Sequence, residues 1–235
     1  GDLVTILSGH NVTLTQDQPT GAVVINSGGT LTGGGFKLTL NDNAGTTFIF
    51  SNVGTISGNL DIDITGGSAD RPINEVGTGS IRNLTINNAQ TYNLHANLSL
   101  TGNLTLTTGA LTTVNSGGTN NSLTVTGHTE IGPASGGSDQ ATLTCNASTV
   151  SLGASHTSSY ALIVNQGGTF TGGSGTHTIG SFDVKNNSNA KLTLTSGTTN
   201  MSSEKTSDNK AMQISTNATF SHGNGTVNHT LNANT

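Results

Sequence analysis

The sequence predicts an all-β protein wound as a parallel β-helix, and three observations point to this fold class. Short segments alternate apolar and polar residues with a period of two, which is typical of strands with one buried face. The segments end in clusters of Gly, Asn or Ser, which favour turns. Pairs of Thr separated by one residue recur, several of them roughly 17–20 residues after the previous pair, which is close to the period of solenoid repeats.

Seven segments carry the alternation most clearly, and each is long enough for a strand of about 4–6 residues. No segment combines a helical period with a cap and a long run, so we expect no helix. The seven segments are 4–16, 36–41, 59–67, 103–111, 122–128, 141–146 and 191–199.

The Thr-x-Thr pairs place these strands in a repeating frame. Residues 25–40 and 164–179 also share a longer frame, in which an apolar residue and Asn precede Gly-Gly-Thr-apolar-Thr-Gly-Gly. A β-sandwich or jelly roll also contains many short strands and is the alternative architecture, but recurrence at coil length favours the β-helix. The pairs begin at Thr13, Thr30, Thr105, Thr124, Thr142, Thr169, Thr176 and Thr193, with near-matches at Thr85 and Ser99.

A stacked coil needs few large side chains, because its core is a thin column closed by the coils above and below. In residues 167–182, GGTFTGGSGTHTIGSF, we predict that Phe170, Ile179 and Phe182 point inward. The neighbouring Thr residues would point outward, and Gly residues would form the corners. Cys145 also stands at an alternating position and is expected to be buried.

Three segments interrupt the regular pattern: 66–80, 132–140 and 198–213. The last contains four charged residues within a short span, so we expect a protruding loop there. The chain of 235 residues fits one large all-β domain, predicted here as a single β-solenoid domain over 1–235. Because the chain begins with Gly-Asp-Leu-Val rather than Met, we expect it to be a segment of a longer protein.

Composition excludes several classes of function. Only 8% of residues are charged, against roughly 25% in ordinary soluble domains. With 7 Lys and Arg against 12 Asp and Glu, the chain has no basic footprint for nucleic acid. No apolar run approaches the roughly 18 residues of a membrane span. The single cysteine excludes an internal disulfide.

Asp61 and Asp63 are the strongest candidates for chemistry, because residues two apart on a strand share one face. A glycosidase needs two carboxyl groups roughly 5–9.5 Å apart. Such an enzyme would gather these acids with Arg82 or a Lys in a groove. The alternative is that both aspartates replace Thr on the solvent face of the strand, and we favour it. Asp70 and Arg71 are expected to form a solvated pair in a loop.

No motif indicates a metal or cofactor site, and we predict no catalytic, cofactor-binding or metal-binding residue. A metal site would need side chains clustered in space, whereas the histidines are scattered and are expected on the surface or in turns. There is no nucleophile elbow, phosphate loop or calcium-binding repeat. The histidines are His10, His95, His128, His156, His177, His222 and His229.

Outward Thr rows on a flat solenoid face resemble the arrangement used by ice-binding proteins. That function requires Thr pairs at constant spacing on adjacent coils, whereas the intervals here vary and Asn, Asp and Lys interrupt them. Thr is also simply a good strand former. A chain this rich in Asn and Thr contains many glycosylation sequons by chance, so we give them little weight as glycosylation sites. They include Asn11, Asn83, Asn103, Asn146, Asn217 and Asn228.

The opening GDLVTILSGHNVTL resembles the first coil of repetitive β-helical surface and virion proteins. GGTFTGGSGTHTIGSFDV and NATFSHGNGTVNHT are similar to passages in structural and fibre proteins of marine bacteriophages, and bacterial surface adhesins contain similar passages. The resemblance covers about half of the chain in patches. It implies a rigid appendage that is secreted or carried on a virion, and it transfers no catalytic residue to this sequence.

We therefore expect a structural or adhesive segment of a virion appendage, such as a bacteriophage fibre or spike, and not an enzyme. Alternatives are a bacterial surface adhesin or extracellular filament subunit, a β-helical polysaccharide-degrading enzyme, and an ice-binding protein. Expected partners are further copies of the chain in a trimer or filament, other virion proteins, and a host-surface glycan. Neither nucleic acid nor membrane insertion is expected, and the location would be a virion or the cell exterior.

Overall fold

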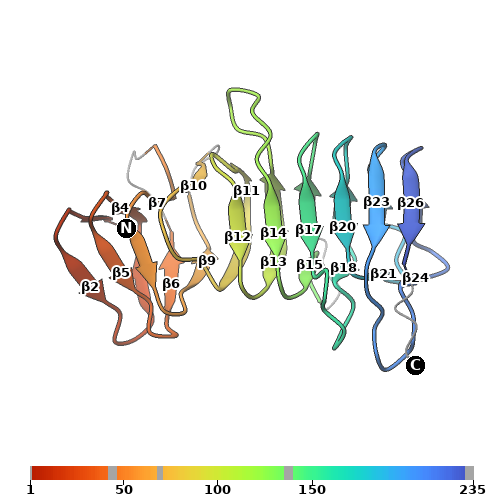
Figure 1. Cartoon of the computed structure of the whole chain (residues 1–235), viewed down its shortest axis with the longest axis horizontal. Helices are drawn as coiled ribbons and strands as arrows, with labels where there is room; N and C mark the ends of the chain where they lie inside the picture. Colours follow the sequence, from red (N-terminus) through yellow and green to blue (C-terminus); the bar gives the residue numbers. More distant parts are fainter. Residues whose placement is uncertain (1, 42–46, 68–70, 135–139, 231–235) are drawn as a thin grey trace.

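The computed structural model describes residues 2–41, 47–67, 71–134 and 140–230, and these residues form strands β1 to β26 without an α-helix. Figure 1 shows the strands stacked along the longest axis, with β2 near one end of the stack and β26 near the other. All pairs between these strands are parallel. The predicted all-β class and parallel β-helix are confirmed.

The chain visits three sheet faces in a fixed order, and each coil contributes one strand to each face, except that the coil between β10 and β11 joins the second face only through isolated bridges. On the first face, a bridge from Ile73 to Leu94 joins the initial sheet to the later strands. The strands of the first face are β1 (Leu3–Ile6), β4 (Ala22–Ile25), β7 (Phe50–Asn52), β10 (Ile73–Glu75), the ends of β11 (Asn83–Asn93) and β13 (Leu104–Thr112), β16 (Ala141–Thr144), β19 (Gly168–Thr171), β22 (Lys191–Thr193) and β25 (Thr219–Ser221).

The second face continues through bridges from Thr55 to Thr78 and from Ile81 to Leu100. Its strands are β2 (Asn11–Thr13), β5 (Thr30–Thr32), β8 (Thr55–Ser57), β12 (Leu98–Leu100), β14 (Leu123–Val125), β17 (Val150–Leu152), β20 (His177–Ile179), β23 (Thr198–Met201) and β26 (Thr226–His229).

The third face also contains the beginnings of β11 and β13, which are long enough to turn the corner onto the first face. Gly109 lies at that corner of β13 with a φ of 86°, which favours glycine. The strands of the third face are β3 (Gln18–Thr20), β6 (Lys37–Leu40), β9 (Asp61–Ile64), β11, β13, β15 (Thr129–Ile131), β18 (Leu162–Val164), β21 (Phe182–Val184) and β24 (Met212–Ile214).

Coil length varies more than the spacing of Thr pairs suggests. Leu3 pairs with Ala22, 19 residues later, whereas Thr129 pairs with Leu162, 33 residues later. The predicted spacing therefore holds only for the shortest coils. The extra residues lie in turns between strands, where a chain tolerates insertions at small cost because the strands stay in register.

Inward side chains stack in columns from coil to coil. On the first face, Leu111, Leu143, Phe170 and Leu192 occupy one register position, and all four are fully buried. The predictions for Phe170, Ile179, Phe182 and Cys145 are confirmed, since each is fully buried. Each column residue is covered by its neighbours along the axis, so a narrow core suffices.

His177 is a correction to the expectation that the histidines lie on the surface. Its ring points into the core between Val150 and Thr199 of the neighbouring coils and is fully buried. The edge of the ring meets Phe170 at a centroid distance of 6.0 Å. His177 stands two residues before the inward Ile179, so alternation itself places it on the inner face. The other six histidines are exposed or half-buried.

The frame shared by residues 25–40 and 164–179 forms the same turn at two different corners. Gly28 and Gly167 both have a positive φ, of 77° and 73°, two residues after the Asn of the frame. In the first copy this turn leads from the first face to the second, and in the later copy from the third face to the first. The sequence unit therefore encodes a strand, a corner and a strand, and not a particular face.

The three segments predicted to break the pattern are only partly irregular. Strand β10 lies within 66–80, so that segment contributes to the first face. Segment 132–140 separates β15 from β16, and its residues 135–139 lie outside the described part of the chain. In segment 198–213, β23 and the start of β24 flank a loop over 202–211. This loop packs on residues 154–160, where Ser203 Oγ donates to the carbonyl of His156.

Candidate functional site

The most regular surface of the molecule is a field of hydroxyl side chains on the first face, which we call the threonine face. It consists of the outward residues of β13, β16, β19, β22 and β25, whose inward neighbours form the core column. Its two columns are Thr112, Thr144, Thr171, Thr193 and Ser221, and Ala110, Thr142, Thr169, Lys191 and Thr219.

The spacing of the threonine face follows from strand geometry. Neighbouring strands lie about 4.8 Å apart, and residues two apart on a strand are separated by about 6.6 Å. The face therefore presents methyl and hydroxyl groups on a two-dimensional grid, interrupted only by Ala110 and Lys191. The variable coil lengths noted in the sequence do not disturb this grid, because the extra residues lie in turns. Such a grid can order water or contact a flat, repeating ligand.

The second face is also neutral along its outward column. One register position runs through Ser99, Thr124, Ser151, Thr178, Asn200 and Asn228. The last two amides are joined by a hydrogen bond of 3.1 Å from Asn228 Nδ2 to Asn200 Oδ1. Its mixture of Ser, Thr and Asn makes it less uniform than the threonine face.

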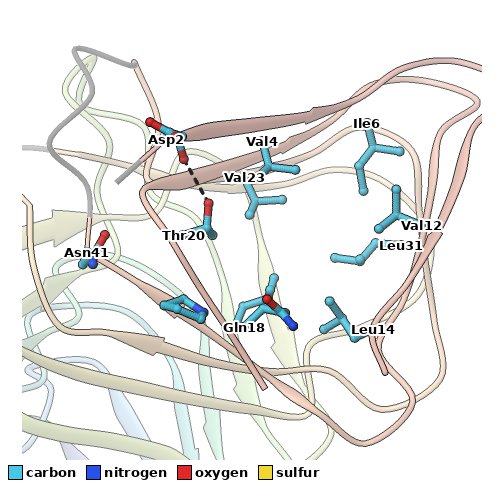
Figure 2. A pocket seen from close by; sticks show the side chains of 12 residues that line it. Asp2, Val4, Ile6, Val12, Leu14, Gln18, Thr20, Val23, Leu31 and Asn41 are labelled. Carbon is cyan, nitrogen blue, oxygen red and sulfur yellow. Dashed lines mark hydrogen bonds between the residues drawn. The ribbon is translucent and has the colours of Figure 1, made fainter. Parts of the chain in front are cut away.

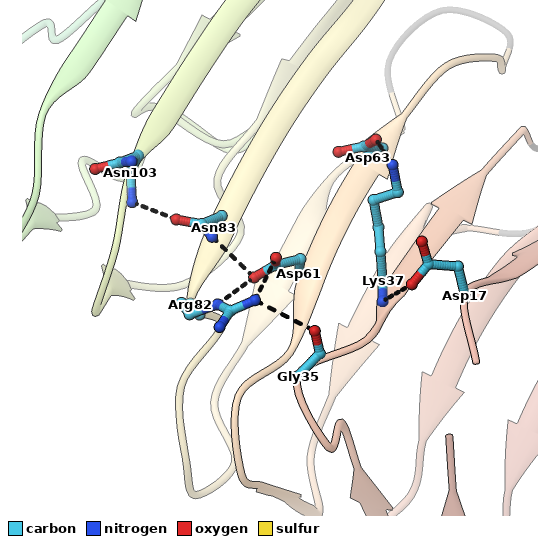
Figure 3. A network of polar contacts seen from close by, with 8 residues as sticks. All are labelled: Asp17, Gly35, Lys37, Asp61, Asp63, Arg82, Asn83 and Asn103. Atoms are coloured by element: carbon cyan, nitrogen blue, oxygen red, sulfur yellow. Dashed lines mark hydrogen bonds and ion pairs between the residues drawn. The ribbon is translucent and has the colours of Figure 1, made fainter. Parts of the chain in front are cut away.

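The two aspartates singled out in the sequence lie on β9, and each has its own cationic partner (Figure 3). Arg82 Nε donates to Asp61 Oδ1 at 2.7 Å, and Arg82 Nη2 donates to Asp61 Oδ2 at 2.6 Å. Asn83 Nδ2 also donates to Asp61 at 3.0 Å. Burial alone would raise the pKa of Asp61, but the hydrogen bonds from Arg82 and Asn83 outweigh it and lower the pKa.

Asp63 forms an ion pair with Lys37, with 2.9 Å between Nζ and Oδ2. An acid/base pair for glycoside hydrolysis needs one carboxyl group held protonated near neutral pH. The lowered pKa of Asp61 keeps that group ionised, and Lys37 gives Asp63 a cation of its own. The predicted placement on the solvent face of an alternating strand is confirmed, and each of the two aspartates is paired with its own cation. Asp70 lies outside the described residues.

A hydrogen-bonded ladder of polar side chains extends from this network along the stack, and the sequence did not reveal it. Asn83 Oδ1 accepts from the backbone N–H of Asn103 at 2.8 Å, and Asn103 Oδ1 accepts from the N–H of His128 at 3.0 Å. Both asparagines immediately precede an inward Leu at the start of a strand. An Asn directly before the first apolar residue of successive strands is the sequence pattern that could have indicated the ladder. Two of the sequon asparagines therefore fix a corner.

Among the histidines, His128 and His156 lie closest together, with ring centroids 5.8 Å apart. Burial and the neighbouring His128 both lower the pKa of His156. Its Nε2 contacts the hydroxyls of Ser159 at 2.9 Å and Ser158 at 3.2 Å. Within the described parts of the chain, no group of three or more His, Cys, Asp or Glu side chains could hold a metal ion. Burial raises the pKa of the Cys145 thiol, which makes it a weak nucleophile.

Two of the hollows in the described surface differ in character. The larger, of about 540 Å³, is the open end of the core beside the first coil (Figure 2). It is lined mainly by apolar side chains, including Val4, Val12 and Leu14. The smaller, of about 240 Å³, is polar and lies beside β18 and β21. Its lining includes Asn165, Gln166, Asn186, Asn187 and Lys185.

Compared with known proteins, the chain matches no protein-family model, no curated protein and no solved structure at a significant level. What defines its class is the fold itself, a parallel β-helix with neutral polar faces. In the part of the chain that the structure describes, no helix is long and apolar enough to cross a membrane.

Proposed function

We propose that the chain is a stiff structural segment of a virion appendage, such as a bacteriophage fibre or spike, that projects or attaches the particle. The observation that carries this proposal is the continuity of three parallel sheets along the stack. Hydrogen bonds between coils run along the axis, so bending in any direction would stretch those of the face on the outer side of the bend. A rod of this kind gains length by adding coils and needs no larger core.

The outer surface supports the same role. Outward positions of the first and second faces carry Thr, Ser and Asn, and the aspartates of β9 are paired with cations. A neutral, hydrated exterior stays soluble without attracting polyions. Where the appendage contacts a host glycan, the polar hollow whose lining includes Asn186 and Asn187 offers amide groups, which match sugar hydroxyls as donors and acceptors.

A bacterial surface adhesin or filament subunit would need the same rod, and the location of the chain distinguishes the two. Immunogold electron microscopy with antibodies raised against the purified chain tests this directly on native material. Label along a tail fibre or spike supports the virion assignment. Label on cell-surface fibres replaces it with the adhesin, and label confined to the cell interior overturns both.

Ice binding is a second candidate function, and the threonine face is the observation that favours it. Thr144 and Thr171 lie in the column of the threonine face that begins at Thr112. Each has a Thr hydroxyl in register on the strand before it and on the strand after it. Thermal hysteresis and inhibition of ice recrystallisation measure this activity. If the face binds ice, Thr144→Lys and Thr171→Lys abolish it, whereas Thr178→Lys on the second face leaves it intact. Absence of activity in the native chain, or equal loss in all three variants, excludes this function for the threonine face.

A further inference from the structure

Two long turns from different coils meet on the surface of the rod. The strands β17, β20 and β23 lie side by side on the second face (Figure 1), and each is followed by a turn that leads to the third face. After β17 this turn spans residues 153–161, and after β23 it spans 202–211. After β20, only Gly180 and Ser181 separate the two strands. The first and third turns can therefore meet across the short turn of the coil between them.

Three hydrogen bonds join the two long turns directly. All of them run from the 202–211 turn to backbone carbonyls of the 153–161 turn, across the coil that separates the two. They are the bonds from Ser202 Oγ to the carbonyl of Ala154 at 2.7 Å, from Ser203 Oγ to that of His156 at 3.0 Å, and from the N–H of Thr206 to that of Thr157 at 2.9 Å. Two coils that are not neighbours along the axis are thus in direct contact.

Tyr160 provides a second point of attachment between the same two coils. It belongs to the 153–161 turn but is only 4% exposed. Its hydroxyl donates to Gln213 Oε1 of β24 at 3.0 Å, and Lys205 Nζ lies 5.2 Å from the centre of its ring. A cation over an aromatic face is attracted by the ring quadrupole. The coil that contains β23 and β24 therefore holds Tyr160 by both its hydroxyl and its ring.

The coil between the two long turns is covered where they meet. Asp63 and Asp183 stand in the same outward column of the third face, yet the side chain of Asp63 is 24% exposed and that of Asp183 only 2%. Burial, and next the charge of Asp183, raise the pKa of Tyr160, so this carboxylate lies near the phenol. Its burial on an outward position shows that the contact between the coils closes over the middle coil.

A solenoid ordinarily joins each coil only to its two neighbours, so one coil can open without disturbing the second coil along the axis. We propose that the turns over 153–161 and 202–211 form a clasp that holds three successive coils together as one unit. The coil of β23 then cannot separate from the coil of β20 without also breaking its bonds to the coil of β17. Local opening along the rod should therefore involve all three coils at once.

Hydrogen exchange of the full chain, followed by mass spectrometry, tests the proposal. Peptides that cover β18, β21 and β23 report the three coils separately, and each of these strands pairs with a strand on both sides. In the native chain their amides should share one opening free energy, because they are exposed in the same event. The triple variant Ser202→Ala/Ser203→Ala/Lys205→Ala removes two hydrogen bonds and the contact with the Tyr160 ring. Exchange of β23 should then become roughly 10- to 100-fold faster than that of β18.

Two further variants make the test specific to the clasp. Ser207→Ala/Lys210→Ala changes the same turn, but Ser207 bonds to Asp208 of that turn and Lys210 is exposed, so this control should keep the native pattern. Tyr160→Phe removes only the hydroxyl that bonds to Gln213. It should speed exchange of β23 over β18 by roughly 2- to 10-fold, although Tyr160 lies two coils away. This conservative variant keeps the proposal testable if the triple variant does not fold, which circular dichroism establishes.

The inference is overturned if β23 already exchanges faster than β18 in the native chain, by as much as in the triple variant. Equal acceleration of all three strands in the triple variant overturns it too, because the turns would then add stability without joining the coils. A control that behaves like the triple variant has the same consequence. The structural role proposed above survives these results, because it is tested by location on the particle and does not depend on the clasp.

Discussion

Two titratable groups, the buried His177 and the half-buried Glu75, should give this protein an unusual stability profile in mild acid. Burial lowers the pKa of His177 to about 4, and both ring nitrogens lack a hydrogen-bond partner. Burial also raises the pKa of Glu75 to about 7, although Asn52 donates a hydrogen bond of 2.7 Å to it. Each group resists the charged form, but the charged forms appear on opposite sides of the pH scale.

The signs of the two contributions follow from linkage between proton binding and folding. For His177, the unfolded chain takes up a proton near pH 6.5, so its contribution is complete above that pH and is lost as the pH falls toward 4. For Glu75, the contribution is complete below pH 4.5 and is lost as the pH rises toward 7. At about 1.4 kcal/mol per pKa unit, each is worth about 3 kcal/mol. Between pH 4.5 and 6.5 the two contributions change with pH in opposite directions by nearly equal amounts, so the free energy of unfolding of the native chain stays nearly constant there.

Single substitutions should therefore reveal opposite slopes. In Glu75→Gln, the free energy of unfolding should fall by about 2–3 kcal/mol as the pH is lowered from 7 to 4.5. Of the two groups, only His177 then still titrates in this pH range. In His177→Leu it should rise by about the same amount over the same range. Urea unfolding followed by circular dichroism measures both. Thr178→Val, on the outward side of the same strand, serves as the control and should keep the native profile.

The result that would refute this reasoning is specific. If both variants keep the flat profile of the native chain, neither group is held in its neutral form by burial. If only the Glu75 variant changes slope, the account of Glu75 stands and that of His177 fails, because each substitution removes only the contribution of its own side chain to the slope.

Three further substitutions test the core, a corner and the polar network by their free energies of unfolding. Phe170→Ala should cost about 3–5 kcal/mol, because it empties the centre of a buried column; a loss below about 1 kcal/mol would mean that the column collapses freely. Gly173→Ala should cost more than Gly35→Ala, since both have a positive φ but only at Gly173 would a Cβ strike backbone; equal losses would contradict this. Arg82→Gln should cost about 2 kcal/mol by leaving half-buried Asp61 without its cation, and an unchanged stability would show that solvent replaces it.

The alternation of apolar and polar residues predicted the winding and the inward residues correctly wherever the inward side chain was apolar. The same pattern placed His177 beside Ile179 on the inner face, yet the general preference of histidine for the surface suggested otherwise. Here local periodicity outweighed residue type, because turning one strand residue outward would turn its neighbours inward as well.

The pairing of charges could not be predicted from the sequence. Asp61 lies 21 residues from Arg82, and Asp63 lies 26 residues from Lys37, distances that are set by the length of each coil. Because turns of different length leave the strands in register, sequence separation does not reveal which side chains meet across coils. The uniform grid of the threonine face was missed for the same reason, as variable intervals concealed constant spacing.

The sequence by itself determined that the chain is all-β, which residues of each strand face the core, and where glycine and asparagine turn the backbone. These are local properties, fixed by the two-residue period of a strand and by the backbone freedom of turn residues. Only the tertiary structure decided the length of each coil, the partners of Asp61 and Asp63, and the alignment of Thr into columns. Those features depend on which coils are neighbours along the axis, and that is settled by contacts between residues distant in the sequence.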